Sequence, residues 1–132
     1  MAEQFAKSWL AQNNLSAQYK VVSRALTDRY EAPNSAASSQ AVQVLADEFS
    51  LDLSSHRSAL LTAKDVDDAK FIIGVTKLHV ETIKRMFPAA AGKVYNFDAD
   101  VPDPWHAPVD VYHACAVKLE PLVYRSLDQL LV

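Results

Sequence analysis

A short acidic loop at residues 98–106, Asp-Ala-Asp-Val-Pro-Asp-Pro-Trp-His, carries residue types suited to acid/base chemistry. Its two prolines fix their own φ angles and favour extended backbone before them, so the Asp103 carboxylate is presented on a stiff chain. Trp105 places a flat aromatic wall beside that carboxylate. The loop therefore predicts a general acid next to a surface for a ring-shaped substrate. The alternative is a structural loop in which Asp103 caps a turn or pairs with Arg57.

The same region contains enough carboxylates and imidazoles for a metal-site hypothesis. Oxygen and imidazole ligands suit Mg²⁺, Mn²⁺ or Zn²⁺. The histidines show no recurrent metal-binding spacing, so we interpret the aspartates as solvated turn residues and predict neither a metal nor a cofactor. The residues concerned are Asp98, Asp100, Asp103, His106, Asp110 and His113.

Two other groups have nucleophilic side chains. Ser54-Ser55-His56 suggests a serine and histidine pair, but sequence neighbours rarely reach hydrogen-bond geometry and no elbow motif surrounds them. We predict instead that His56 is hydrogen-bonded within a loop. Cys115 lies on the apolar side of the predicted terminal helix, where a cysteine is usually a small inert hydrophobe.

Composition limits the class of protein. The 132 residues, half of them hydrophobic, fit one domain over residues 1–132. Thirteen basic and sixteen acidic residues give a formal charge of −3 without a basic stripe, which argues against nucleic acid and anionic membranes as partners. The single cysteine excludes an internal disulfide and suits a reducing compartment. Without a signal region or a membrane-length apolar run, we predict a cytoplasmic protein.

Periodicity predicts helices and strands in alternation. We expect helices at residues 1–13, 39–49, 62–69, 76–87 and 108–131, and strands at 19–23, 70–75 and 93–97. This order favours an α/β fold of three layers, with a small, mostly parallel sheet flanked by helices. Ligands of such sheets bind beyond the carboxyl ends of the strands, and the acidic loop directly follows the last strand.

Together, these segments resemble the low-molecular-weight protein tyrosine phosphatase family over essentially the whole chain. Val-Pro-Asp-Pro-Trp at residues 101–105 is similar to the family's acid loop, in which the aspartate before proline is the general acid and the aromatic residue borders the phosphotyrosine. The resemblance implies that Asp103 is the acid and that Trp105 contacts the substrate.

Further residues follow from the same resemblance. Leu-Asp-Leu-Ser-Ser-His-Arg-Ser at residues 51–58 matches a family stretch whose histidine is structural, so His56 is expected to orient the site. Ser23 falls where the family has a serine that supports the phosphate loop. Tyr30, before Pro33, matches an aromatic residue that shapes substrate choice.

The sequence departs from the family pattern in one respect. Family members have a central strand and a loop with a cysteine six positions before an arginine, followed by Ser-Pro and then Met-Ala-Glu. Here Met1-Ala2-Glu3 comes first, and the position six after Cys115 is Pro121. We therefore expect a sheet that lacks the family's first central strand, and no nucleophile among these residues.

The expected function depends on this departure. The resemblance implies hydrolysis of phosphotyrosine monoesters, in a phosphotyrosine protein or a small phosphate monoester, and we predict that the chain as given is inactive. The alternative is a non-catalytic pseudophosphatase that acts as a binding or regulatory module. Strands left without a neighbour are expected to pair with each other in a rearranged sheet, to aggregate, or to pair between chains in a homodimer.

Overall fold

The structure is a computed structural model that describes residues 1–27 and 32–131. Tyr30, predicted to contact substrate, lies outside these residues. The elements are α1 (Ala2–Gln12), α2 (Ser39–Phe49), α3 (Ala63–Asp68), β1 (Ile72–Gly74), α4 (Lys77–Met86), the 3₁₀ helix η1 (Pro88–Lys93), β2 (Val94–Asn96) and α5 (Val109–Leu131). All five predicted helices are confirmed. Two of the three predicted strands are confirmed in shortened form.

The sheet in the described part of the chain has two parallel strands, with Ile72 of β1 opposite Val94 of β2. Helix α4 connects them and packs closely against β1, because Gly74 has no side chain at the point of approach. A Cβ added there would lie 2.7 Å from Cγ2 of Val80. Parallel strands joined by a helix end at the same edge of the sheet, so β2 delivers the acidic loop beside the start of α4.

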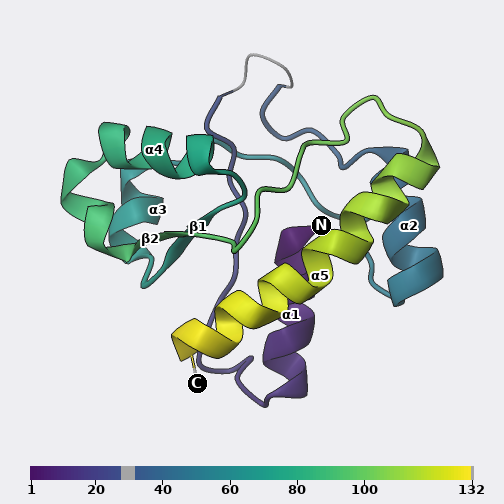
Figure 1. Cartoon of the computed structure of the whole chain (residues 1–132), viewed down its shortest axis with the longest axis horizontal. Helices are drawn as coiled ribbons and strands as arrows, with labels where there is room; N and C mark the ends of the chain where they lie inside the picture. Colours follow the sequence, from purple (N-terminus) through teal and green to yellow (C-terminus); the bar gives the residue numbers. More distant parts are fainter. Residues whose placement is uncertain (28–31, 132) are drawn as a thin grey trace.

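The hydrophobic core lies where α1, α2 and α5 meet, on the side of the sheet away from α4 (Figure 1). Phe5 and Leu45 are completely buried, and the Phe5 ring stands edge-on to Phe49, with centroids 5.0 Å apart. Trp9 of α1 also donates its indole N–H to Asp128 of α5 at 3.2 Å. These contacts fix α1 against α5, which sets the position of the α1 amino-terminal end.

Local signals explain where several helices begin. Thr62 and Asp65 form the predicted capping box of α3, in which each side chain accepts from the other's backbone N–H. Thr76 caps α4 by accepting from the N–H of His79.

Helix α5 continues through Pro121, a residue that cannot donate a backbone hydrogen bond. In the described residues, no helix is both long and apolar enough to cross a bilayer.

The predicted strand at 19–23 is wrong. This β-branched segment runs between the sheet and α1, but among the described residues it pairs with no strand, and Ala25 alone forms an isolated parallel bridge, to Leu60. Sequence propensity favours extended backbone, whereas a strand also requires a neighbouring ladder. Direct pairing of this segment with β1, one of the expected rearrangements, is not formed. The segment instead contacts the residues just before β1, since the Lys70 ammonium lies 5.6 Å from the Tyr19 ring centroid.

Candidate active site

A cavity of about 250 Å³ opens between the acidic loop and the amino-terminal end of α1. Asp103 and Trp105 line it from the loop, and His56 and Leu53 line it from the segment before α3. Met1 lines it from the α1 end, where, in the described structure, no side chain caps the helix. The first turn of a helix has backbone N–H groups without intrahelical partners and carries a partial positive charge. The cavity is therefore suited to an anion.

The acidic loop has a defined internal geometry. The Asp103 carboxylate accepts a hydrogen bond from the Trp105 N–H at 3.0 Å, and the Pro104 carbonyl accepts from the Ala107 N–H at 2.8 Å. His106 adopts a left-handed φ of 63°, which histidine tolerates better than most residues, and its ring stacks on Trp105 with centroids 3.8 Å apart. Asp103 thus caps a turn, as the structural alternative predicts, and it also lines the cavity.

The hydrogen bonds of the Arg57 side chain in the described residues go to backbone carbonyls and not to Asp103. The guanidinium donates to the carbonyl of His56, its neighbour, at 2.7 Å and to that of Ser54 at 3.4 Å. Asp103 itself is exposed and lines the cavity. Trp105 is 42% exposed, an unusually open position for a tryptophan beside a cavity.

The predicted supporting residues Ser23 and His56 are brought together by a residue that the sequence analysis missed. Glu3 of α1 accepts hydrogen bonds from the Ser23 N–H at 2.8 Å and from the Ser23 hydroxyl at 3.1 Å. The other carboxylate oxygen of Glu3 lies 3.9 Å from Nδ1 of His56. It also accepts a hydrogen bond from the Lys7 ammonium at 3.0 Å. An acidic residue in the first turn of a helix was the available signal, since a carboxylate there stabilises the helix dipole.

We expect Glu3→Gln to lower the stability of the fold near neutral pH by about 1–2 kcal/mol, because it weakens hydrogen bonds to a charged group. Burial raises the pKa of Glu3, but the hydrogen bonds from Lys7 and Ser23 outweigh it and hold this pKa below its usual value. A lowered folded-state pKa gives stability that is present above the unfolded value and lost as pH falls through the folded value. Urea unfolding measured between pH 3 and 7 should therefore show the two proteins converging at the acid end. A constant difference at every pH would contradict this.

Neither alternative nucleophile is placed for catalysis. The Ser54 hydroxyl donates to Asp52, and no hydrogen bond joins it to His56 in the described residues. The Cys115 thiol is half-buried on α5 and lies 3.9 Å from the Pro102 carbonyl oxygen. Burial raises the pKa of this thiol, and the Asp103 carboxylate adds to the effect. The unreactive, protonated form is thus favoured at neutral pH.

We expect Cys115 in the folded protein to react with a disulfide reagent at pH 7 at least about tenfold more slowly than in the urea-unfolded chain, because only the thiolate attacks. Absorbance of the released thiol dye measures both rates. Equal rates in the folded and unfolded protein would contradict the assignment of Cys115 as a structural residue.

No group of three or more histidine, cysteine, aspartate or glutamate side chains in residues 1–27 and 32–131 is arranged to hold a metal ion. Asp98 pairs with Arg125 at 3.0 Å, and His113 contacts Glu48. The metal-site interpretation has no geometric support in this part of the chain.

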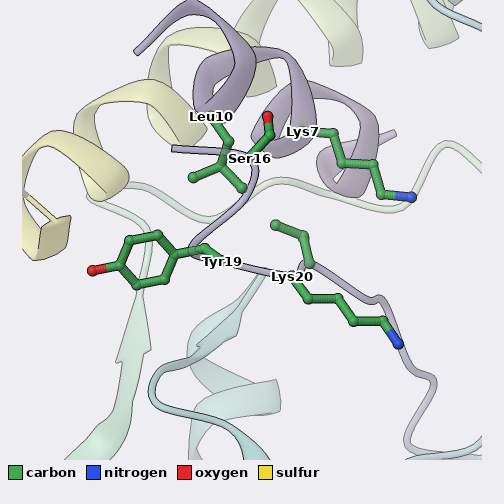
Figure 2. A pocket seen from close by; sticks show the side chains of 6 residues that line it. Lys7, Leu10, Ser16, Tyr19 and Lys20 are labelled. Atoms are coloured by element: carbon green, nitrogen blue, oxygen red, sulfur yellow. The ribbon is translucent and has the colours of Figure 1, made fainter. Parts of the chain in front are cut away.

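A second hollow of about 310 Å³ is lined by Lys7, Leu10, Ser16, Tyr19 and Lys20, with Val21 (Figure 2). It shares no lining residue with the first. In Figure 2 the two lysine side chains extend to the same side, and Leu10 and the aromatic ring of Tyr19 lie on the opposite side. The lining contains no carboxylate or imidazole, so we place the candidate chemistry at the smaller cavity.

The structure defines an α/β protein with a small parallel sheet and a carboxylate-bearing loop at the carboxyl ends of the strands. The profile of the family described as "Low molecular weight phosphotyrosine protein phosphatase" matches residues 1–131. The chain belongs to this family.

The individual proteins to which this chain is similar include protein phosphatases. The chain is 32% identical over 82 residues to the Protein-arginine-phosphatase of Geobacillus stearothermophilus, a match that spans 57% of this chain and 55%, or about half, of that relative. The structure of the YwlE arginine phosphatase from the same organism is 29% identical, with a TM-score of 0.80 over 98% of this chain and 84% of that one. A YwlE mutant from Bacillus subtilis is 27% identical, with a TM-score of 0.85 over 98% and 87% of the two chains.

Proposed function

We propose that these residues form the acid-loop half of a protein phosphatase site, in which Asp103 protonates the leaving group. The observation that carries the proposal is the convergence of three separate segments on one cavity. Asp103 and Trp105, His56, and the amino-terminal end of α1 all line it. A carboxylate, an aromatic wall and a helix amino terminus are the groups that a bound phosphate ester requires.

The proposed reaction has two steps. The family's loop thiolate attacks phosphorus, a sulfur–phosphorus bond forms, and the bond to the leaving oxygen breaks as Asp103 gives that oxygen its proton. In the second step the Asp103 carboxylate takes a proton from water, the resulting hydroxide attacks phosphorus, and the thiolate leaves. Trp105 holds the side chain that carries the phosphate, and Glu3, Ser23 and His56 hold the loop that binds the phosphate oxygens.

We further propose that the 132-residue polypeptide by itself does not turn over phosphate esters. Its one cysteine, Cys115, has proline instead of arginine six positions later. Cys115 is not among the residues that line the cavity, which supports assigning the nucleophile of the proposed reaction to another residue. Substantial hydrolysis of p-nitrophenyl phosphate by the purified polypeptide, blocked by an active-site thiol reagent, would contradict this statement.

The deciding experiment joins a family strand and Cys-x5-Arg loop, followed by Ser-Pro, directly to Met1. We call this chimera the loop-completed protein. It should hydrolyse p-nitrophenyl phosphate, and its matched control, with the new loop cysteine changed to serine, should not. A loop-completed protein that folds, as judged by circular dichroism and a cooperative thermal transition, but has no activity above that control would overturn the proposed function.

The substrate we propose is a phosphorylated protein side chain, with phosphotyrosine as the first candidate. Trp105 can stack on a phenyl ring. Phosphoarginine is the second candidate, because the relatives at 27–32% identity include proteins named arginine phosphatases and because a guanidinium group also stacks on tryptophan beside a carboxylate. Values of kcat/KM for one peptide phosphorylated on tyrosine or on arginine, measured with the loop-completed protein, distinguish the two.

A homodimer through the sheet edge is also proposed for the chain as given. In the described residues β1 pairs with β2 alone, and the extended segment 19–23 pairs with no strand. Open edges of this kind recruit further strands. Light scattering during size exclusion should report twice the monomer mass of 14.6 kDa. The loop-completed protein, in which the added strand occupies the edge, should elute as a monomer; monomers in both cases would contradict the proposal.

A further inference from the structure

The start of the acidic loop (residues 98–106) is held in place by the carboxylate of Asp100, which has no part in the proposed reaction. Asp100 lies three positions before Asp103, and its carboxylate accepts a hydrogen bond from the backbone N–H of Lys77 at 3.0 Å. The same oxygen atom lies 3.3 Å from the side-chain amide nitrogen of Asn96, the last residue of β2. A single side chain of the loop thus joins the first residue of α4 to the end of β2.

Sheet topology explains how residues so distant in sequence meet. Strands β1 and β2 are parallel neighbours, so the start of α4 and the start of the acid loop emerge at the same edge. Thr76 accepts from the N–H of His79, which leaves the Lys77 N–H for a different acceptor. Asp100 supplies that acceptor as a negative charge at the positive end of the helix dipole. Helix α4 is itself fixed against the sheet by the close approach at Gly74.

Two further contacts complete the attachment. Lys118 of α5 donates its ammonium group to the Asp100 carbonyl at 2.8 Å, and the Val101 N–H donates to the carbonyl of Val75 at 3.2 Å. The Val101 side chain is 3% exposed. By contrast with the buried Val101, the residues Pro102, Asp103 and Trp105 that follow it are all exposed. The first part of the loop, through Val101, is thus fixed to α4, β2 and α5, whereas the residues that follow are mostly exposed.

We propose that Asp100 is a positioning residue that sets the direction of the acid loop, and hence the place of the Asp103 carboxylate, by anchoring the start of the loop to the amino terminus of α4. This inference rests on the proposed function, since it assigns Asp103 a proton to deliver. Only three positions separate the anchor from the acid, and the two prolines between and after them transmit the orientation with little slack. A displacement of about 1 Å of a catalytic group can cost on the order of a hundredfold in rate.

The test compares Asp100→Ala with Asp100→Asn in the loop-completed protein. Asparagine retains a side-chain oxygen that can accept from the Lys77 N–H, whereas alanine removes it. Asp98→Ala is the matched control, because this exposed aspartate of the same loop pairs with Arg125 on the surface and its loss changes the charge equally. All variants are first compared for thermal unfolding, so that only folded proteins enter the kinetic comparison.

The kinetic measurement uses two leaving groups. Phenol, with a pKa of about 10 like that of tyrosine, needs its proton in the transition state, whereas p-nitrophenol leaves more easily as an anion. We expect Asp100→Ala to lower kcat/KM, which covers only the steps up to departure of the leaving group, about tenfold to a hundredfold with phenyl phosphate and much less with p-nitrophenyl phosphate. Asp100→Asn and Asp98→Ala should stay close to the parent protein with both substrates.

A second measurement uses the 132-residue chain itself. Amide hydrogen exchange of the peptide covering residues 100–106 should become faster in Asp100→Ala and stay unchanged in Asp98→Ala. Equal loss of kcat/KM with both leaving groups, or unchanged exchange together with unchanged kcat/KM, would overturn the inference. Asp103→Asn separates this failure from failure of the proposed function: if that variant shows no loss with phenyl phosphate, the acid assignment is wrong, whatever Asp100 does.

Discussion

Replacing Asp103 with asparagine is expected to lower kcat of the loop-completed protein about 10²- to 10⁴-fold, the usual contribution of a general acid. The substitution is conservative in structure, because the asparagine oxygen can still accept the hydrogen bond that Asp103 takes from the Trp105 N–H. The turn is therefore retained, but the side chain at position 103 has no proton to give to the leaving group. Initial rates with phenyl phosphate at saturating substrate measure the effect.

Two comparisons make this prediction specific. Asp98→Asn removes an exposed carboxylate from the same loop and should leave kcat within about twofold, because surface substitutions away from special features rarely have large effects. In the 132-residue polypeptide, which is proposed to be inactive, Asp103→Asn should change nothing. A similar fractional loss of activity in both backgrounds would show that the catalytic assignment of Asp103 is wrong.

Replacing Phe5 with alanine is expected to lower the free energy of unfolding by about 3–5 kcal/mol, the usual cost of deleting a large buried aromatic side chain. Phe5 has no exposed surface, and its ring meets Phe49 edge-on at the junction of α1 and α2. Domains of this kind are stable by only about 5–15 kcal/mol, so the variant should be close to unfolding at 37 °C. Urea titration followed by circular dichroism measures the midpoint and the slope.

Two control substitutions accompany this prediction: a smaller change at the same buried position, and a change at an exposed position. Phe5→Leu keeps most of the buried volume and should cost much less than the alanine substitution. Val117→Ala removes a side chain that is 52% exposed on α5 and should change stability by less than about 0.5 kcal/mol. A loss below about 1 kcal/mol for Phe5→Ala would mean that α1 is not an integral part of the core.

Local signals in the sequence were sufficient for the helices. Thr62 and Asp65 form a capping box without help from the rest of the fold, and Thr76 begins α4 for the same kind of reason. The acid loop was also visible, because two prolines around an aspartate restrict the backbone wherever the segment is placed. These features depend on residues within a few positions of one another, and such interactions are encoded in the local sequence.

The predicted strand at residues 19–23 is wrong because a strand is not a local structure. Residues 19–23 have the β-branched composition of a strand and do run extended, yet the described residues provide no ladder for them. Instead the Ser23 N–H turns to the carboxylate of Glu3. Backbone groups must find some partner, and the fold decides which one is within reach.

The sequence by itself determined the stiff acidic loop around Asp103, the helix starts and the α/β order, because each depends on stereochemistry within a short segment. Only the tertiary structure showed that Glu3 links Ser23 to His56, and that Asp100 reaches the start of α4. These partners are distant in the chain and become neighbours when helices pack and parallel strands end at one edge. No local pattern encodes those long-range contacts.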